Sequence, residues 1–170
     1  IYGYLLWIAL EILTGPGRDE GAMRLRFHAG VVAAWSFFTA ITGAFVAGLD
    51  AGRAYNTFPL MDGRIVPEAM FELDPWIINF FENAAAVQFT HRVLAISLWL
   101  IVLAFWVHAM RGPAFGRIRS ASVILAVVAT CQAGLGIATL LSDVQIGIAA
   151  SHQAGAMLLL TCAIWALFET

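Results

Sequence analysis

Four histidines lie in stretches of the chain that carry almost no other ionisable side chain: His28, His91, His108 and His152. An ionisable group inside a long apolar segment is costly, so such residues are candidates for function. His28 lies two residues after Arg26, and His108 lies three residues before Arg111. Both are therefore expected near a polar boundary, where a histidine reaches water and a structural role is favoured.

His91 and His152 differ from the other two because they lie deeper in their segments. Each follows an acidic residue by nine positions, Glu82 in one case and Asp143 in the other. If both segments are helices that run in the same direction, each histidine lies at most about 13 Å beyond its acidic residue. The two imidazoles are thus predicted at matched depth, where they could face each other.

Two histidines without a third ligand favour haem over a simple metal ion. A zinc or di-metal site uses three or four ligands, usually including cysteine or carboxylate. No acidic residue lies at that depth, and Cys131 and Cys162 fall lower on their helices. A haem iron needs only two axial ligands from the protein, because the porphyrin supplies the other four. The alternative is two satisfied polar residues in a helix bundle.

Several neighbours of the two histidines have two interpretations each. Small residues could make room for a flat macrocycle or could serve helix packing; they are Gly43, Ala44, Ala47, Gly48, Ala149, Gly155 and Ala156. Arg92 could pair with a haem propionate or could extend toward the polar boundary. Gln88 and Gln153 could hydrogen-bond the second imidazole nitrogens or could link helices.

The elements that must position these residues are long and apolar. The chain has 170 residues, of which 61% are hydrophobic and 12% charged, whereas soluble chains average about 25% charged residues. This composition predicts an all-α membrane protein, a four-helix transmembrane bundle with spans at 27–49, 84–110, 120–141 and 144–168. Residues 1–13 extend only about 20 Å as a helix, short of a bilayer core of about 30 Å. They are interpreted as the end of an upstream transmembrane helix.

Charges in the connecting segments predict how the bundle is oriented. Residues 14–26 contain Arg18, Arg24 and Arg26, and residues 111–119 contain Arg111, Arg117 and Arg119. The long loop 50–83 carries six acidic residues and two arginines. The positive-inside rule therefore places both arginine-rich segments in the cytoplasm or matrix and the acidic loop outside.

Composition also excludes two classes of protein. A net charge of −2 and two cysteines give neither the basic face of a nucleic-acid binder nor a disulfide scaffold.

Six runs of residues, in this order and spacing, resemble the haem A synthase family: Thr42–Gly52, Tyr55–Pro59, Phe81–Asn83, Gln88–Arg92, Gln132–Thr139 and Ser151–Gly155. The resemblance extends from about Phe27 to Phe168. It is to the mitochondrial and alphaproteobacterial type, since the loop 50–83 lacks the cysteine pair of other bacterial members.

The resemblance implies an eight-span protein made of two similar four-helix halves, each with a histidine pair. The first half binds the substrate haem O, and the second holds a haem b cofactor. Residues 27–170 match the second half, residues 14–26 form an inner loop, and residues 1–13 match the end of the fourth span. His91 and His152 are then the axial ligands of the haem b iron, with Arg92 beside its propionates.

The implied reaction is oxidation of the haem O C8 methyl group to a formyl group, which gives haem A for cytochrome oxidase. These 170 residues are expected to hold the electron-passing cofactor but no catalytic residue, and so not to complete the reaction alone. Implied partners are haem O, the lipid bilayer, an electron-transfer partner, and haem O synthase or cytochrome oxidase assembly factors.

Two other classes remain open from the residues alone. One is a cytochrome b-like electron-transfer subunit, and the other is a non-redox bundle such as a transporter or assembly scaffold. Nine arginines and no lysine favour a bacterial plasma membrane over a mitochondrial inner membrane.

Overall fold

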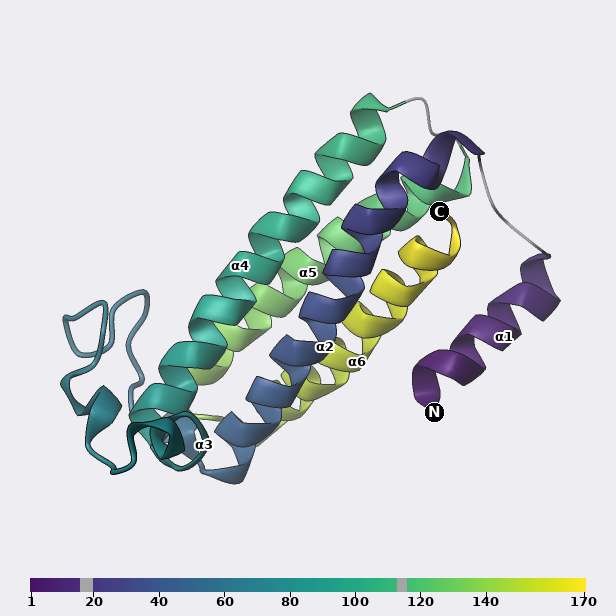
Figure 1. Cartoon of the computed structure of the whole chain (residues 1–170). Coiled ribbons are helices and arrows are strands. Elements are labelled where there is room, and N and C mark those ends of the chain that lie inside the picture. The colour runs from purple at the N-terminus through teal and green to yellow at the C-terminus, as the bar shows by residue number, and fades with distance from the viewer. Residues whose placement is uncertain (16–19, 113–115) are drawn as a thin grey trace.

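The computed structural model describes residues 1–15, 20–112 and 116–170, and within these ranges the chain is helical with no strand. Arg18, one of the predicted inner-loop arginines, lies outside the described residues. Six α-helices carry the labels of Figure 1: α1 Tyr2–Thr14, α2 Arg26–Gly48, α3 Asn79–Glu82, α4 Ala84–Arg111, α5 Arg117–Leu141 and α6 Ile146–Phe168.

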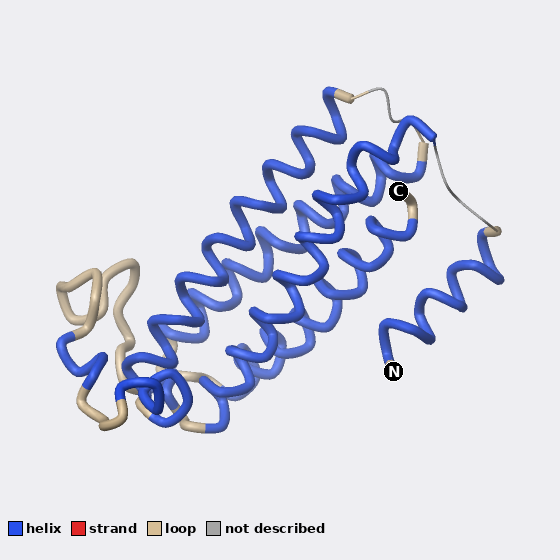
Figure 2. Tube along the Cα trace, viewed as in Figure 1, coloured by secondary structure: helices blue, strands red, loops and turns tan. Residues whose placement is uncertain are grey.

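Four long helices form an up-and-down bundle (Figures 1 and 2). Going around the bundle, α2 packs on α4, α4 on α5, α5 on α6, and α6 back on α2. Helices α4 and α6 therefore occupy opposite corners, as do α2 and α5. This diagonal relation means that a side chain from α4 can meet one from α6 only in the interior of the bundle.

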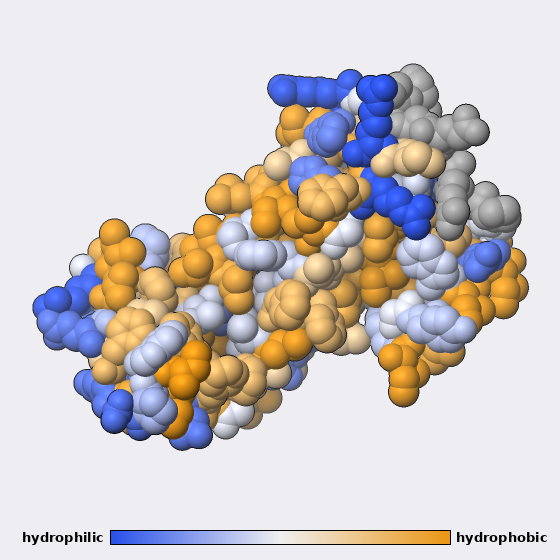
Figure 3. Space-filling view, viewed as in Figure 1, coloured by the Kyte–Doolittle hydropathy of each residue, from blue (hydrophilic) through white to orange (hydrophobic). Residues whose placement is uncertain are grey.

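All four bundle helices are long and apolar enough to cross a membrane. The hydropathy surface agrees, since hydrophobic side chains cover the middle of the molecule and hydrophilic ones gather toward its two ends (Figure 3). The prediction of an all-α transmembrane bundle is confirmed. We call the end that carries Arg26, Arg111 and Arg117 the arginine end, and the opposite end, where residues 50–83 lie, the loop end.

Side chains cap the two helices that start at the loop end. Asn83 Oδ1 accepts hydrogen bonds from the backbone N–H groups of Ala85 and Ala86, at 2.9 and 3.3 Å. Gln145 Oε1 accepts from the N–H of Ile148 at 2.8 Å. Such caps satisfy donors that the first turn of a helix leaves without partners. The starts of α4 and α6 are thereby fixed, and with them the depth of any residue along these helices.

Helix α5 begins at Arg117, three residues before the predicted start of the third span at residue 120. The charges of Arg117 and Arg119 had predicted that the loop continues to residue 119. Long arginine side chains can extend toward water from the first turn of a helix, so they do not end it.

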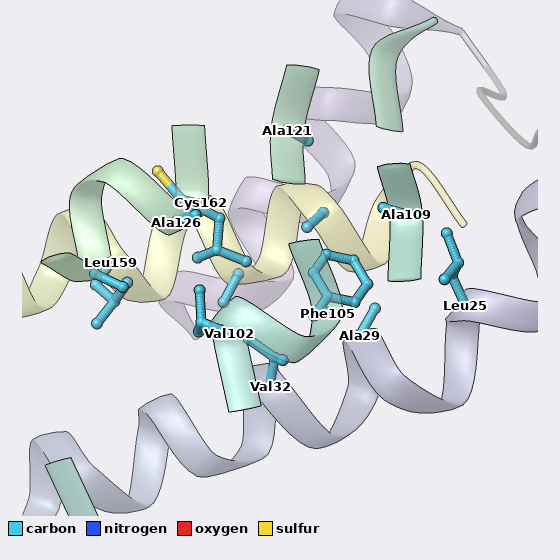
Figure 4. Close-up of a cluster of buried hydrophobic side chains, with 14 of the residues drawn as sticks. Leu25, Ala29, Val32, Val102, Phe105, Ala109, Ala121, Ala126, Leu159 and Cys162 are labelled. Carbon is cyan, nitrogen blue, oxygen red and sulfur yellow. The ribbon is translucent and has the colours of Figure 1, made fainter. Parts of the chain in front are cut away.

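The hydrophobic core, whose side chains are drawn in Figure 4, is formed by residues in the arginine-end half of the bundle. Phe105, Val102 and Leu125 are fully buried there, and on α4 the core reaches toward the loop end only as far as Leu98. Because α4 begins at the loop end, His91 lies two turns beyond that limit. The histidine level therefore lies outside the close-packed core.

Helix α1 stands at the edge of the bundle and packs on α6 (Figure 1). Tyr2 Oη lies 2.6 Å from Thr161 Oγ1, and the Trp7 ring stands edge-on to Phe168. Near the arginine end, Arg117 donates to the carbonyl of Thr14 at 3.2 Å.

Candidate functional site

The rings of His91 and His152 meet inside the bundle. His91 is the eighth residue of α4 and His152 the seventh of α6, so each lies about 10 Å from the loop end of its helix. Their ring centroids are 6.5 Å apart, and the ring planes are inclined at 80°. Since the two residues come from helices at opposite corners, the rings approach each other across the interior.

A hydrogen bond from the His91 ring to Thr42 on α2 favours one position of the imidazole proton. Thr42 Oγ1 donates its single proton to the carbonyl of Thr39 at 2.9 Å. It can then only accept from Nδ1 of His91, which lies 3.0 Å away. A neutral imidazole protonated on Nδ1 carries its lone pair on Nε2. The contact with Thr42 thus favours the His91 tautomer whose Nε2 lone pair is free to bind a metal.

Gln132 on α5 supports His152 through the backbone. Its Nε2 donates to the carbonyl of His152 at 2.7 Å, which links α5 to α6 at the level of the ring. A Cβ added at Gly155 would overlap Gln132 Oε1. Gly155 thus makes room for the Gln132 side chain, which favours the helix-packing interpretation of this small residue.

Arg92 and Gln88 reach from α4 to the loop 50–83. The two terminal nitrogens of Arg92 donate to the carbonyls of Tyr55 at 2.8 Å and Thr57 at 2.9 Å. Gln88 Nε2 donates to the Tyr55 carbonyl as well, at 3.1 Å. Both side chains are therefore anchors for the loop, a role that the sequence did not suggest.

Arg92 also brings a positive charge into the interior, because it is only 8% exposed, and its hydrogen bonds to the two carbonyls leave that charge without an acidic partner within the described ranges. The ion pairs found in the described part of the chain lie elsewhere: Arg53–Asp50, Arg64–Glu68 and Arg117–Glu169. A buried cation is stable only with an anionic or strongly polar partner. The Nε of Arg92 still has no partner among the described residues, so the site is suited to an acidic ligand group.

The remaining predicted residues lie apart from this pair. Gln153 is exposed on α6. His28 and His108 form a second pair at the arginine end, with ring centroids 5.9 Å apart. They come from neighbouring helices, and the His28 ring packs edge-on against the buried Phe105. His108 is exposed, so this pair sits at the polar boundary, beside the close-packed core.

The distance between the His91 and His152 rings is compatible with both imidazoles holding one metal-containing group. Two imidazoles bonded to opposite sides of one metal ion at about 2 Å have ring centres about 6 Å apart, close to the observed 6.5 Å. Within the described residues no group of three histidine, cysteine or acidic side chains could hold a metal ion. Buried polar atoms that lack a partner in the same ranges include His152 Nδ1, Gln88 Oε1 and Gln132 Oε1.

Sequence reasoning did not assign Thr42 or Gln132 to the site. Each is the first residue of one of the six runs described above, Thr42–Gly52 and Gln132–Thr139. A polar side chain isolated in an apolar helix was the available signal, but spacing along one helix does not tell which residue of another helix it meets.

A transmembrane four-helix bundle with facing histidines from opposite corners belongs to the class of membrane proteins that can hold a cofactor between their helices. The chain itself belongs to the family described as cytochrome oxidase assembly protein (COX15-CtaA), whose sequence profile matches residues 1–164. The family resemblance inferred from the six runs is thereby confirmed.

Individual relatives agree with this family. The chain is 43% identical to haem A synthase of Nitrosospira multiformis, across 99% of this chain and 48% of that protein. It is 45% identical to haem A synthase of Rhodospirillum centenum, across 98% of this chain and 45% of that protein. It is 41% identical to human haem A synthase COX15, across 99% of this chain and 42% of that protein. The chain spans about half the length of these relatives.

Proposed function

We propose that this chain is the haem b-holding half of a haem A synthase, with His91 and His152 as the two axial ligands. The observation that carries the proposal is the approach of two imidazoles from opposite corners of the bundle, with ring centroids 6.5 Å apart. Relatives of this chain are named haem A synthase. The whole protein would accordingly oxidise the C8 methyl group of haem O to a formyl group.

The chain's own residues divide the work of holding such a group. His91 presents Nε2 because Thr42 accepts its Nδ1 proton, and Gln132 fixes the backbone of His152. The buried charge of Arg92 suits the carboxylates at the edge of a haem. At the loop end of the bundle, Gln88 and Arg92 hold residues 55–57 of the loop through hydrogen bonds to its carbonyls.

A haem with two strong axial ligands has no open coordination position and transfers electrons rather than activating oxygen. No residue of this chain is therefore assigned a catalytic role, and haem O would bind mainly to another part of the protein. An electron-transfer partner follows from this division of labour. Haem O synthase or cytochrome oxidase assembly factors are further proposed partners, on the basis of the family resemblance. We propose a bacterial plasma membrane, with the mitochondrial inner membrane as the alternative, because nine arginines and no lysine are typical of a GC-rich genome.

The test uses the full-length protein expressed in cells that lack their own haem A synthase. Extracted haems are separated by chromatography, and the purified protein is examined by optical and EPR spectroscopy. We expect haem A in cells with the unchanged protein. With His91→Ala or His152→Ala we expect haem O to accumulate and the low-spin bis-histidine signal to disappear.

Gln153→Ala is the matched control, since Gln153 adjoins His152 in sequence but is exposed. This variant should keep both haem A and the low-spin signal. An unchanged protein without bound haem, or a His91→Ala protein that keeps a bis-histidine signal, would contradict the proposal.

A further inference from the structure

Each of the two facing histidines lies against a glycine of a neighbouring helix. A Cβ added at Gly43 on α2 would lie 3.1 Å from Cε1 of His91. A Cβ added at Gly136 on α5 would lie 2.9 Å from Cε1 of His152. Carbon atoms in good contact are about 3.5–4.0 Å apart. At both positions, therefore, any side chain would press on the imidazole ring.

The two contacts are arranged in the same way on both sides of the site. The histidines come from α4 and α6, at one pair of opposite corners, and the glycines come from α2 and α5, at the other pair. Each ring thus extends from one helix over the bare backbone of the next. The contact is not general to helical glycines of this bundle, because a Cβ at Gly30, Gly48 or Gly134 would meet nothing within 4 Å.

We infer that Gly43 and Gly136 are positioning residues that seat the rings of His91 and His152 and thereby set the orientation of the two ring planes. The inference rests on the proposed function, because ring orientation has a consequence only when both rings bind one iron. It assigns to the two glycines a role distinct from close helix packing, the usual function of small residues in membrane bundles.

The two rings differ in the contacts that hold them besides the contact with Gly43 or Gly136. The His91 ring is also held by the hydrogen bond to Thr42, the residue that precedes Gly43. Nδ1 of His152 is buried without a partner among the described residues, and its ring makes the closer contact. A methyl group at Gly136 should therefore disturb its histidine more than a methyl group at Gly43.

The experiment compares four variants of the full-length, haem-loaded protein: Gly136→Ala, Gly43→Ala, Gly134→Ala and Gly48→Ala. Gly134→Ala is the matched control for Gly136→Ala on α5, and Gly48→Ala is the matched control for Gly43→Ala on α2. Readouts are the EPR g-values of the low-spin haem, the haem bound per protein, and the fraction that binds carbon monoxide, which reports an open iron position. Alanine favours helix more than glycine does, so loss of helix stability cannot explain a loss of haem.

We expect Gly136→Ala to shift the g-values, lose part of the bound haem and raise the carbon monoxide-binding fraction. Gly43→Ala should shift the g-values by less, and both controls should match the unchanged protein. If Gly136→Ala does not accumulate in the membrane, the comparison of Gly43→Ala with Gly48→Ala decides.

Unchanged g-values and haem content in Gly43→Ala and Gly136→Ala would overturn this inference and leave the proposed function standing. So would g-value shifts in the two control variants as large as those in Gly43→Ala and Gly136→Ala. If the unchanged protein holds no bis-histidine haem, the proposed function fails, and this inference fails with it.

Discussion

At the scale of single residues, the two histidine pairs of the bundle have different surroundings. His91 and His152 meet from opposite corners beyond the end of the hydrophobic core. His28 and His108 come from adjacent helices next to the buried Phe105. A flat macrocycle needs space between helices, and close-packed interiors leave little. Of the two pairs, the loop-end pair therefore has the surroundings that a flat macrocycle would need.

We predict that His28→Ala and His108→Ala leave the low-spin haem signal unchanged, because water can satisfy histidines at a polar boundary. Optical and EPR spectra of the full-length variants provide the measurement. Loss of the signal in either of these variants, with retention in His91→Ala, would move the haem to the arginine end.

Thr42→Val should weaken haem binding without abolishing it. The variant removes the acceptor for the His91 Nδ1 proton, and loss of a partner of a metal-bound histidine typically costs about 10–100-fold in affinity. Haem titration of the apoprotein measures the change. Thr139→Val is the control, since the Thr139 hydroxyl donates only to a carbonyl of its own helix; equal effects of both variants would refute the role of Thr42.

At the scale of elements, helix α4 does more than carry His91. In its first three turns it is capped by Asn83, bonds the loop through Gln88 and Arg92, and presents His91. Because these residues follow one another within a few positions, the loop and the histidine ring are positioned by the same rigid segment.

We predict that Arg92→Met loosens the loop at residues 54–60. The substitution removes two buried hydrogen bonds from a charged donor, each of which contributes about 1.5–3 kcal/mol. Hydrogen–deuterium exchange of that segment should become faster, and the melting temperature should fall.

Arg64→Met is the matched control for the loop. Its ion pair with Glu68 has side chains that are 60% and 73% exposed, and exposed pairs of this kind contribute about 0–1 kcal/mol. If Arg64→Met loosened the loop as much as Arg92→Met, the anchoring role of Arg92 would be wrong.

At the scale of the whole molecule, the arrangement of the ends determines how the protein sits in a membrane. Helices α2 and α5 begin at the arginine end, and α4 and α6 return to it (Figure 1). The acidic loop 50–83 lies at the other end. The positive-inside rule then predicts that the arginine end is cytoplasmic, which places the histidine pair nearer the outer surface.

Cysteine labelling tests this orientation in a protein whose Cys131 and Cys162 are replaced by alanine. A maleimide that cannot cross membranes should label Asp62→Cys in intact cells. It should label Arg111→Cys only after the cells are permeabilised. Equal labelling of both positions in intact cells would contradict the predicted topology.

Much of this protein follows from the sequence because a membrane imposes simple rules. In a helical membrane bundle every span must be apolar along its length, so uncharged runs locate α2, α4, α5 and α6 to within about three residues of the bounds in the structure. The matched offsets of His91 and His152 from Glu82 and Asp143 likewise fix their depth, since depth along a helix is proportional to residue number.

The tertiary structure alone decided what each side chain meets, because contacts between helices depend on rotation and on which corners the helices occupy. Spacing could not tell that Thr42 bonds His91, that Gly155 faces Gln132, or that Arg92 binds loop carbonyls. Nor could it tell that Gly43 and Gly136 lie under the rings while Gly134 faces nothing. The sequence by itself determined the helices and the levels of the histidines, and packing determined the partners at each level.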